Sequence, residues 1–241
     1  SALLDAGYYV NASVKSTNTA YFSFNYPASP SGHAFGVNLL SGMGMSMNAV
    51  FPKSVDLDGV PIYFLTRMAM GCKSATEIKN LILSVRSAYG GSLNIGSAKD
   101  GVVNIEFGPT SSGSSTKNLI VTSPPVNGSA IFHMNEYLYL HGVPFDLDPS
   151  SEHRLKAAKR INVEHPVSAS DSSSLLYVLS DRSDRDYPLW RNTSGLGDSS
   201  TAATALFEFM KSGMKSGRVL LTVFEKGNPM MKSTKKVVFE L

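Results

Sequence analysis

The sequence predicts an α+β fold in a single domain that spans residues 1–241, and three observations support this. The chain has 241 residues, of which 42% are hydrophobic, enough to bury one large core. The spacing of its hydrophobic residues alternates along the chain between a period of two and a helical period. The resulting order is strands, two helices, strands, two helices and strands. Each sheet should carry helices on one face and meet the other sheet on its inner face.

The first half begins with two predicted hairpins, whose strands are rich in aromatic and β-branched residues and whose connections are polar or contain glycine. The four strands are Tyr8–Lys15, Ala20–Tyr26, Phe35–Leu40 and Gly44–Val50.

Two helices are predicted next. The first begins near Pro61, a residue that suits an opening turn, and its apolar stripe runs from Ile62 to Cys72, so Cys72 is predicted to lie in the core. The second begins with Ser74 and Glu77, which form a capping box in which each side chain satisfies a free backbone N–H group. The apolar residues of the second helix recur at helical spacing: Ile78, Leu81, Ile82, Val85 and Tyr89.

In the second half, strands return from Gly91, with alternation through Phe107 and again over Asn118–Thr122, followed by a predicted strand at Ala130–His133. The low-complexity stretch Ser111–Thr116 is predicted to be a loop. Helical patterns then cover Ser150–Asn162 and Asp171–Leu179, and the chain ends in strands at Ala203–Met210, Arg218–Phe224 and Lys235–Leu241.

The composition argues against several classes of site. The net charge is only +3, and the basic residues near the C-terminus, Lys232, Lys235 and Lys236, indicate a solvated strand and not a nucleic-acid surface. The single cysteine excludes an internal disulfide and a multi-thiolate metal site, and the five histidines show no metal-binding spacing. We therefore expect no cofactor and no metal. No apolar run reaches the roughly 20 residues that span a bilayer.

Three N-glycosylation sequons, at Asn11, Asn127 and Asn192, are compatible with a secretory route. The chain begins without a methionine, and Ser1–Tyr9 lacks the pattern of a signal peptide. We therefore expect a processed protein that is secreted or vesicular.

Three stretches, in this order and at these separations, resemble the N-terminal-nucleophile linear amide hydrolases and acyltransferases, the family that includes penicillin acyltransferase and β-alanyl-dopamine hydrolase. The bile-salt hydrolases are more distant relatives. The stretches are G-M-S-M-N-A-V followed by D-G-V-P-I-Y-F-L-T-R within Gly44–Arg67, F-H-M-N-E-Y-L at Phe132–Leu138, and Y-P-L-W-R at Tyr187–Arg191.

The resemblance implies a four-layer αββα sandwich and an enzyme that acts on a small N-acyl amide. It places Asn48 and Asn135 at the oxyanion-hole positions and Arg191 in the polar network around the nucleophile. In this family the nucleophile is a cysteine that autocleavage frees, and its own α-amino group is the base. Other roles stay open from the residues alone. The two asparagines could tie neighbouring strands together, and Arg191 could pair with an aspartate of Asp181–Asp186.

The chain departs from the family pattern at the nucleophile. In the family a cysteine-bearing strand and a glycine-x-asparagine-x-aspartate segment precede the first hairpin, and Tyr8–Ser13 resembles the strand just after that segment. The resemblance therefore predicts that a second processed fragment or subunit supplies the nucleophile. Ser1, with a free amine beside its hydroxyl, and Cys72 are weaker candidates.

Two functions follow from this departure. The first is an amide hydrolase or acyltransferase that is completed by a separate nucleophile segment. The second is a catalytically inactive relative that serves as a secreted binding, storage or assembly protein. The sequence leaves the oligomeric state open, a homo-oligomer included.

Overall fold

The computed structural model describes residues 7–32, 34–110, 118–124, 130–192, 200–210, 218–232 and 234–240. Ser1, the sequon at Asn127 and the predicted loop Ser111–Thr116 lie outside the described residues.

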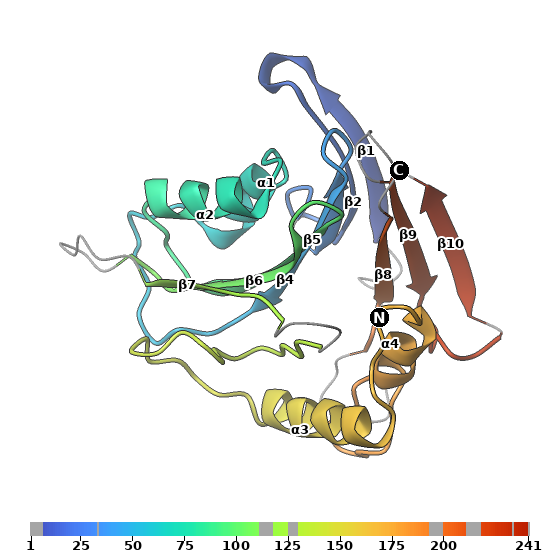
Figure 1. Cartoon of the computed structure of the whole chain (residues 1–241). Coiled ribbons are helices and arrows are strands. Elements are labelled where there is room, and N and C mark those ends of the chain that lie inside the picture. The colour runs from blue at the N-terminus through green and yellow to red at the C-terminus, as the bar shows by residue number, and fades with distance from the viewer. Residues whose placement is uncertain are drawn as a thin grey trace.

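The α+β class is confirmed, because the described residues form two antiparallel sheets and separate helices (Figure 1). In the larger sheet seven strands follow one another in chain order. They are β1 (Tyr8–Val14), β2 (Thr19–Asn25), β3 (Phe35–Asn38), β4 (Met43–Ala49), β5 (Gly91–Ser97), β6 (Gly101–Phe107) and β7 (Leu119–Thr122). The smaller sheet has the order β10–β9–β8, formed by β8 (Ala203–Met210), β9 (Arg218–Glu225) and β10 (Lys235–Glu240).

Helices α1 (Ile62–Ala69) and α2 (Ala75–Ser84) cover one face of the larger sheet (Figure 1). The predicted capping box starts α2, since Ser74 Oγ accepts from the N–H of Glu77 at 3.2 Å and the Glu77 carboxylate accepts from the N–H of Lys73 at 2.9 Å. The helices and strands share one hydrophobic cluster, which includes Leu65, Ile78 and Ile82 from the helices and Met45, Leu93, Ile95, Ile105 and Phe107 from the strands.

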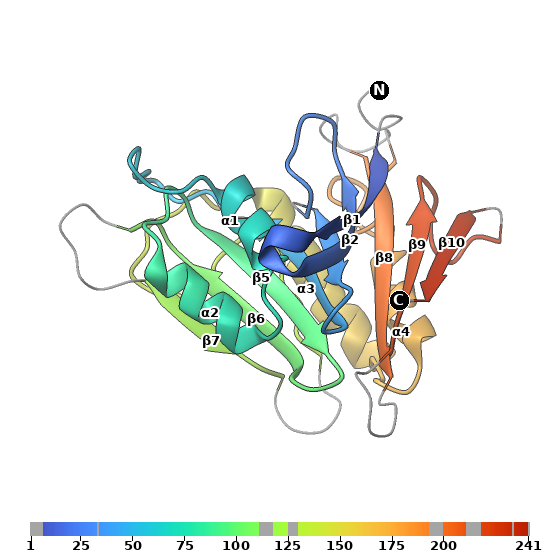
Figure 2. The ribbon, with the colours of Figure 1, turned by 90° about the horizontal axis from the view of Figure 1, so that it is seen from above.

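The opposite face of the larger sheet has two parts. On β2 and β3 it is apolar, and residues of β8 and β9 pack on it, so that the small sheet lies beside these strands (Figure 2). The shared cluster contains Phe22, Phe24, Phe35, Val37, Val219, Leu221 and Val223. On β4 to β6 the same face is polar, because the alternation of each strand places serine, asparagine and glutamate there.

Helices α3 (Pro149–Glu164) and α4 (Ser172–Leu179) form the second helical pair, and aspartates cap both. Asp148 accepts from the N–H of Ser150, and Asp171 accepts from the N–H of Ser173. The buried residues of the pair pack with Met134 and its neighbours in a separate hydrophobic cluster. Because this pair packs largely on the segment around Met134, the four-layer stacking stays a prediction.

Three local predictions were wrong. Ala130–His133 is not a strand, because this stretch is anchored by the His133 side chain and not by a strand ladder. The helix predicted to run to Tyr89 ends at Ser84, since Val85 has an extended backbone. Cys72 lies beyond the end of α1 and is half-buried against the helix–sheet cluster, not fully in the core.

No helix within the described residues has the length and apolar character needed to cross a bilayer.

Candidate functional site

A ladder of polar side chains crosses the face of the larger sheet that α1 and α2 leave free. Asn104 Nδ2 on β6 donates to Asn94 Oδ1 on β5 at 2.9 Å, and Asn94 Nδ2 donates to Asn48 Oδ1 on β4 at 2.6 Å. The strand register makes this possible, because Asn94 lies opposite Asn104 on one side and Ser46 on the other. Asn48 thus ties β4 to β5 through its oxygen. Its Nδ2 group has no acceptor among the described residues and stays available to a ligand.

Asn135 lies against the end of β4, in the segment between the larger sheet and α3. Its Nδ2 donates to the carbonyl oxygen of Ala49 at 2.9 Å, and Ala49 directly follows Asn48. Its Oδ1 accepts from Arg154 Nη2 at 2.9 Å. An arginine can only donate, so this contact fixes which end of the amide faces β4. The structure therefore brings the two predicted asparagines to the same strand end.

Two arginines meet at Ser150 in the first turn of α3. Arg191 Nη2 donates to Ser150 Oγ, and Arg154 Nε donates to the carbonyl oxygen and Oγ of the same serine, at 3.1 Å each. Burial and then the like charge of Arg191 lower the pKa of Arg154 to about 10, although Asp148 and Glu136 oppose this shift.

The alternative role for Arg191, an ion pair with a preceding aspartate, finds no support among the described residues. Asp184 contacts His153 Nδ1 at 2.7 Å, and Asp181 accepts from the hydroxyl of Ser183. No described carboxylate lies within ion-pair distance of either Arg154 or Arg191. The site therefore holds two guanidinium groups side by side without an acidic partner from these residues.

No sequence pattern marks Arg154 as a site residue. It lies on a predicted helix, four residues after Ser150, and no motif links it to Asn135. The only sequence signal was its place near the start of that helix, which is too common to mark a site.

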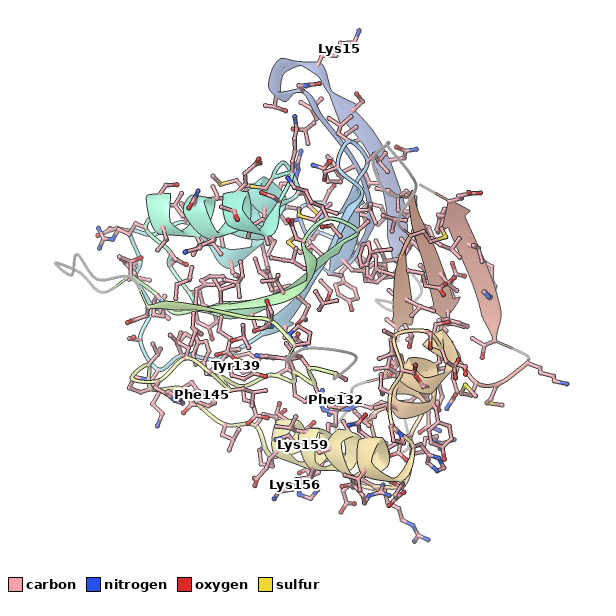
Figure 3. All side chains as sticks on the ribbon, in the orientation of Figure 1. Lys15, Phe132, Tyr139, Phe145, Lys156 and Lys159 are labelled. Atoms are coloured by element: carbon pink, nitrogen blue, oxygen red, sulfur yellow. The ribbon has the colours of Figure 1, made fainter. Side chains whose placement is uncertain are left out.

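Glu106 is the other residue that the sequence did not single out. Its carboxylate lies at the end of the polar face on β6, is 0% exposed, and accepts from four N–H groups. Burial alone would raise the pKa of this carboxyl group, but the bonds from His133 and from three backbone N–H groups lower it below its usual value. The segment that donates these bonds lies near the side chains Phe132, Tyr139 and Phe145 that are labelled in Figure 3.

An apolar cavity adjoins the polar ladder. Its volume is ≈ 240 Å³, and Ser46 and Asn94 of the ladder form part of its wall. The remaining lining comes from the sheet, from β8 and from α4, and includes Val102, Leu175, Leu179, Leu206, Phe207 and Phe209.

Of the two weaker nucleophile candidates, Cys72 lies away from this site. Cys72 packs in the cluster on the α1–α2 face, the face opposite to the ladder, and burial together with the charge of Glu77 raises the pKa of its thiol to about 11. Ser1 lies outside the described residues. Within the part of the chain that the structure describes, no three histidine, cysteine, aspartate or glutamate side chains are grouped to hold a metal ion.

Comparison with known proteins confirms the family that the three motifs suggested. A search of curated proteins finds no significantly similar relative. The family model described as acyl-coenzyme A:6-aminopenicillanic acid acyl-transferase matches residues 3–216, which is most of the chain and includes all three motifs. The chain therefore belongs to the acyl-coenzyme A:6-aminopenicillanic acid acyl-transferase family.

Proposed function

We propose that this chain forms the oxyanion-binding half of an amide hydrolase or acyltransferase that acts on a small N-acyl compound. Family membership suggests acyl transfer or hydrolysis. The observation that carries the proposal is the position of Asn48 and Asn135 at one end of β4, with the Asn48 Nδ2 group free of described acceptors.

The chemistry of amide cleavage needs such donors. When a thiolate attacks an amide carbonyl, negative charge develops on the oxygen, and each preorganised N–H donor can stabilise it by roughly 3 kcal/mol. Asn94 fixes the amide plane of Asn48, and Arg154 fixes that of Asn135. Asn135 uses one N–H for the Ala49 carbonyl and retains the other. Both donors are therefore oriented before a substrate arrives.

Two further features support this reaction class. The cavity of ≈ 240 Å³ beside Ser46 and Asn94 offers apolar walls for a short acyl group. Arg191, which has no described acidic partner, suits the aspartate of the nucleophile segment that the family resemblance implies.

We propose that the nucleophilic cysteine comes from a second processed fragment or subunit. A strand of that fragment would complete a four-layer αββα sandwich around the small sheet. Two contacts support this layering, since α1 and α2 already cover the outer face of the larger sheet and β8 and β9 pack on its other face. Secretion and glycosylation are part of the same proposal, and Asn11 is exposed on β1 as a glycan site requires.

The second candidate function is a catalytically inactive relative that binds, stores or assembles. The observation in its favour is that no described cysteine lies at the polar ladder. Intact-mass measurement and N-terminal sequencing of the purified protein separate the two candidates. An associated fragment that begins with cysteine is expected for the enzyme, and a gene without such a segment would exclude it.

Replacement of Asn135 by alanine tests the site itself. Asn135→Ala should lower the turnover of an N-acyl substrate by about two to three orders of magnitude, because one oxyanion donor is lost. The matched control is Asn80→Ala, which changes an exposed asparagine on α2. Turnover is measured on a panel of N-acyl amines and amino acids, with circular dichroism as a check on folding. Equal turnover in the folded Asn135→Ala variant and in wild type would remove Asn135 from the mechanism.

A further inference from the structure

The carboxylate of Glu106 is the most completely bonded acidic group on the polar face. Its Oε1 accepts from His133 Nε2 at 2.6 Å and from the N–H of Leu138 at 2.7 Å. Its Oε2 accepts from the N–H groups of Tyr139 at 2.9 Å and Leu140 at 2.6 Å. The side chains of Glu106 and His133 are 0% and 2% exposed, so these bonds are shielded from water.

His133 makes a second contact that restricts its ring. Its Nδ1 lies 2.8 Å from the carbonyl oxygen of Met134, while its Nε2 faces the Glu106 carboxylate. The two contacts hold the ring between the backbone and the carboxylate. A buried hydrogen-bonded pair, Glu106 and His133, therefore joins β6 to the segment that carries Asn135.

Glu106 is hydrogen-bonded to residues on both sides of Asn135 in the chain. His133 is two residues before Asn135, and Leu138 begins the run of bonded N–H groups three residues after it. Tyr137 lies between His133 and Leu138 in the chain, and its hydroxyl donates to the carbonyl oxygen of Phe107 at 2.8 Å. That hydroxyl occupies space that only a glycine leaves open, because a Cβ atom on Gly90 would lie 1.8 Å from it.

Such an anchor does more than hold the fold. A buried charged group is often no more stabilising than apolar side chains of the same size, so stability alone does not explain a carboxylate here. A carboxylate differs from an apolar side chain because its hydrogen bonds are directional, and each bond fixes the position of one N–H group. Asn135 Nδ2 can donate to the carbonyl oxygen of Ala49 only if the segment that carries Asn135 lies at the correct distance from the sheet.

We infer that Glu106 is a positioning residue for the reaction: through His133 and residues 138–140 it holds the Asn135 amide against the end of β4. This inference rests on the proposed role of Asn135 in turnover. Glu106 itself lies on β6, and it acts on the substrate only through Asn135.

A double-mutant cycle separates this role from a general structural one. Glu106→Gln preserves the size of the side chain, but one carboxylate oxygen becomes an NH₂ group that cannot accept. We expect kcat to fall about 10- to 100-fold, with KM changed less than about threefold, because a small displacement of a catalytic group has an effect of this size. In the Asn135→Ala background the same change should alter kcat by less than about twofold. Glu164→Gln, at an exposed residue paired with Arg160 on α3, is the matched control and should leave kcat unchanged.

A second readout needs neither substrate nor nucleophile. The side-chain ¹⁵N–¹H₂ signals of Asn135 should shift and exchange faster with solvent in Glu106→Gln, because the bond to Ala49 is loosened. His133→Leu keeps Glu106 and removes one of its donors. It should shift the same signals less, and it is the variant to use if Glu106→Gln does not fold.

Three results would overturn the inference. One is an unchanged kcat in folded Glu106→Gln, and another is an equal loss of kcat in the wild-type and Asn135→Ala backgrounds. The third is a set of Asn135 signals that neither variant moves. Full turnover by Asn135→Ala would instead contradict the proposed function, and the amide signals would then decide the positioning role by themselves.

Discussion

At the scale of single residues, the site depends on polar side chains that are held by other polar side chains. Asn48 is oriented by Asn94, and Asn135 is oriented by Arg154. Arg154 is half-buried beside Arg191, and burial first and then the like charge of Arg191 lower the pKa of Arg154 to about 10. A carboxylate that reached Arg191 would relieve this repulsion, which is a physical reason for the site to accept an acidic group.

Glu106 gives the clearest prediction of pH dependence. Its pKa is lowered in the folded protein relative to the ordinary value of 4.5, so the unfolded chain binds a proton at higher pH than the folded one. The stability from Glu106 is present above the unfolded pKa and is lost as the pH falls through the folded pKa. Glu106→Gln should lower the free energy of unfolding by roughly 2–4 kcal/mol at pH 7.

Urea unfolding of wild type and Glu106→Gln between pH 3 and pH 7 measures this effect. The difference between the two proteins should shrink below about pH 4.5, because Glu106 itself becomes protonated in wild type. The other carboxylates titrate in both proteins, so their effects cancel in the difference. A difference that stays constant across this range would show that the charge of Glu106 contributes nothing to the fold.

At the scale of elements, the capping motif in the sequence predicted the start of α2 correctly. The hydrophobic spacing did not predict its end. The Ser74–Glu77 box was recognised in the sequence and starts α2 as expected. The apolar pattern continued to Tyr89, but the chain turns extended at Val85 because residues 86–88 bond to the stretch before α1. These bonds join Val60 N–H to the Arg86 carbonyl, and Ala88 N–H to the Val60 carbonyl.

Ser74→Ala should reduce the free energy of unfolding by about 1 kcal/mol, because the N–H of Glu77 loses its acceptor in the first turn of α2. Ser84→Ala is the matched control in the same helix, since Ser84 Oγ only donates back to the Leu81 carbonyl and is not an N-cap. Thermal or urea unfolding compares the two variants. An equal effect of both changes would mean that the cap does not stabilise α2.

At the scale of the whole molecule, the two sheets meet where glycines make room for phenylalanines. A Cβ atom on Gly96 would lie 2.3 Å from Phe209 Cε2, and one on Gly44 would lie 2.8 Å from Phe207 Cδ1. The small sheet can therefore approach β4 and β5 closely at this point. The cavity beside the polar ladder is bounded by the same phenylalanines, so the sheet contact also shapes the site.

Gly96→Ala should lower the free energy of unfolding by about 1–3 kcal/mol, because the new methyl group overlaps the Phe209 ring. Adding Phe209→Leu should recover part of this loss. Gly91→Ala on the same strand is the control, since its nearest contact, Ile62 Cδ1, would be 3.3 Å away. Urea unfolding of the four proteins is the measurement, and a Gly96→Ala variant as stable as wild type would show that the sheets do not meet so closely.

Local patterns in the sequence were sufficient for the α+β class, most of the helices and strands, and the family. Two-residue alternation predicted β6 and the C-terminal strands, and the three motifs pointed to Asn48, Asn135 and Arg191. The predictions of class, elements and family succeed because periodicity, capping and short motifs depend on residues that are near one another in the chain. The roles of the three site residues stay a prediction.

Only the tertiary structure showed Arg154 beside Asn135, the Glu106 anchor, and the irregular backbone at Ala130–His133 where a strand was predicted. The contacts responsible join residues 19 to 34 positions apart. A buried carboxylate that accepts hydrogen bonds from a distant segment leaves no periodic signal in the sequence. Its partners are determined by the packing of that segment on the sheet and not by their spacing along the chain.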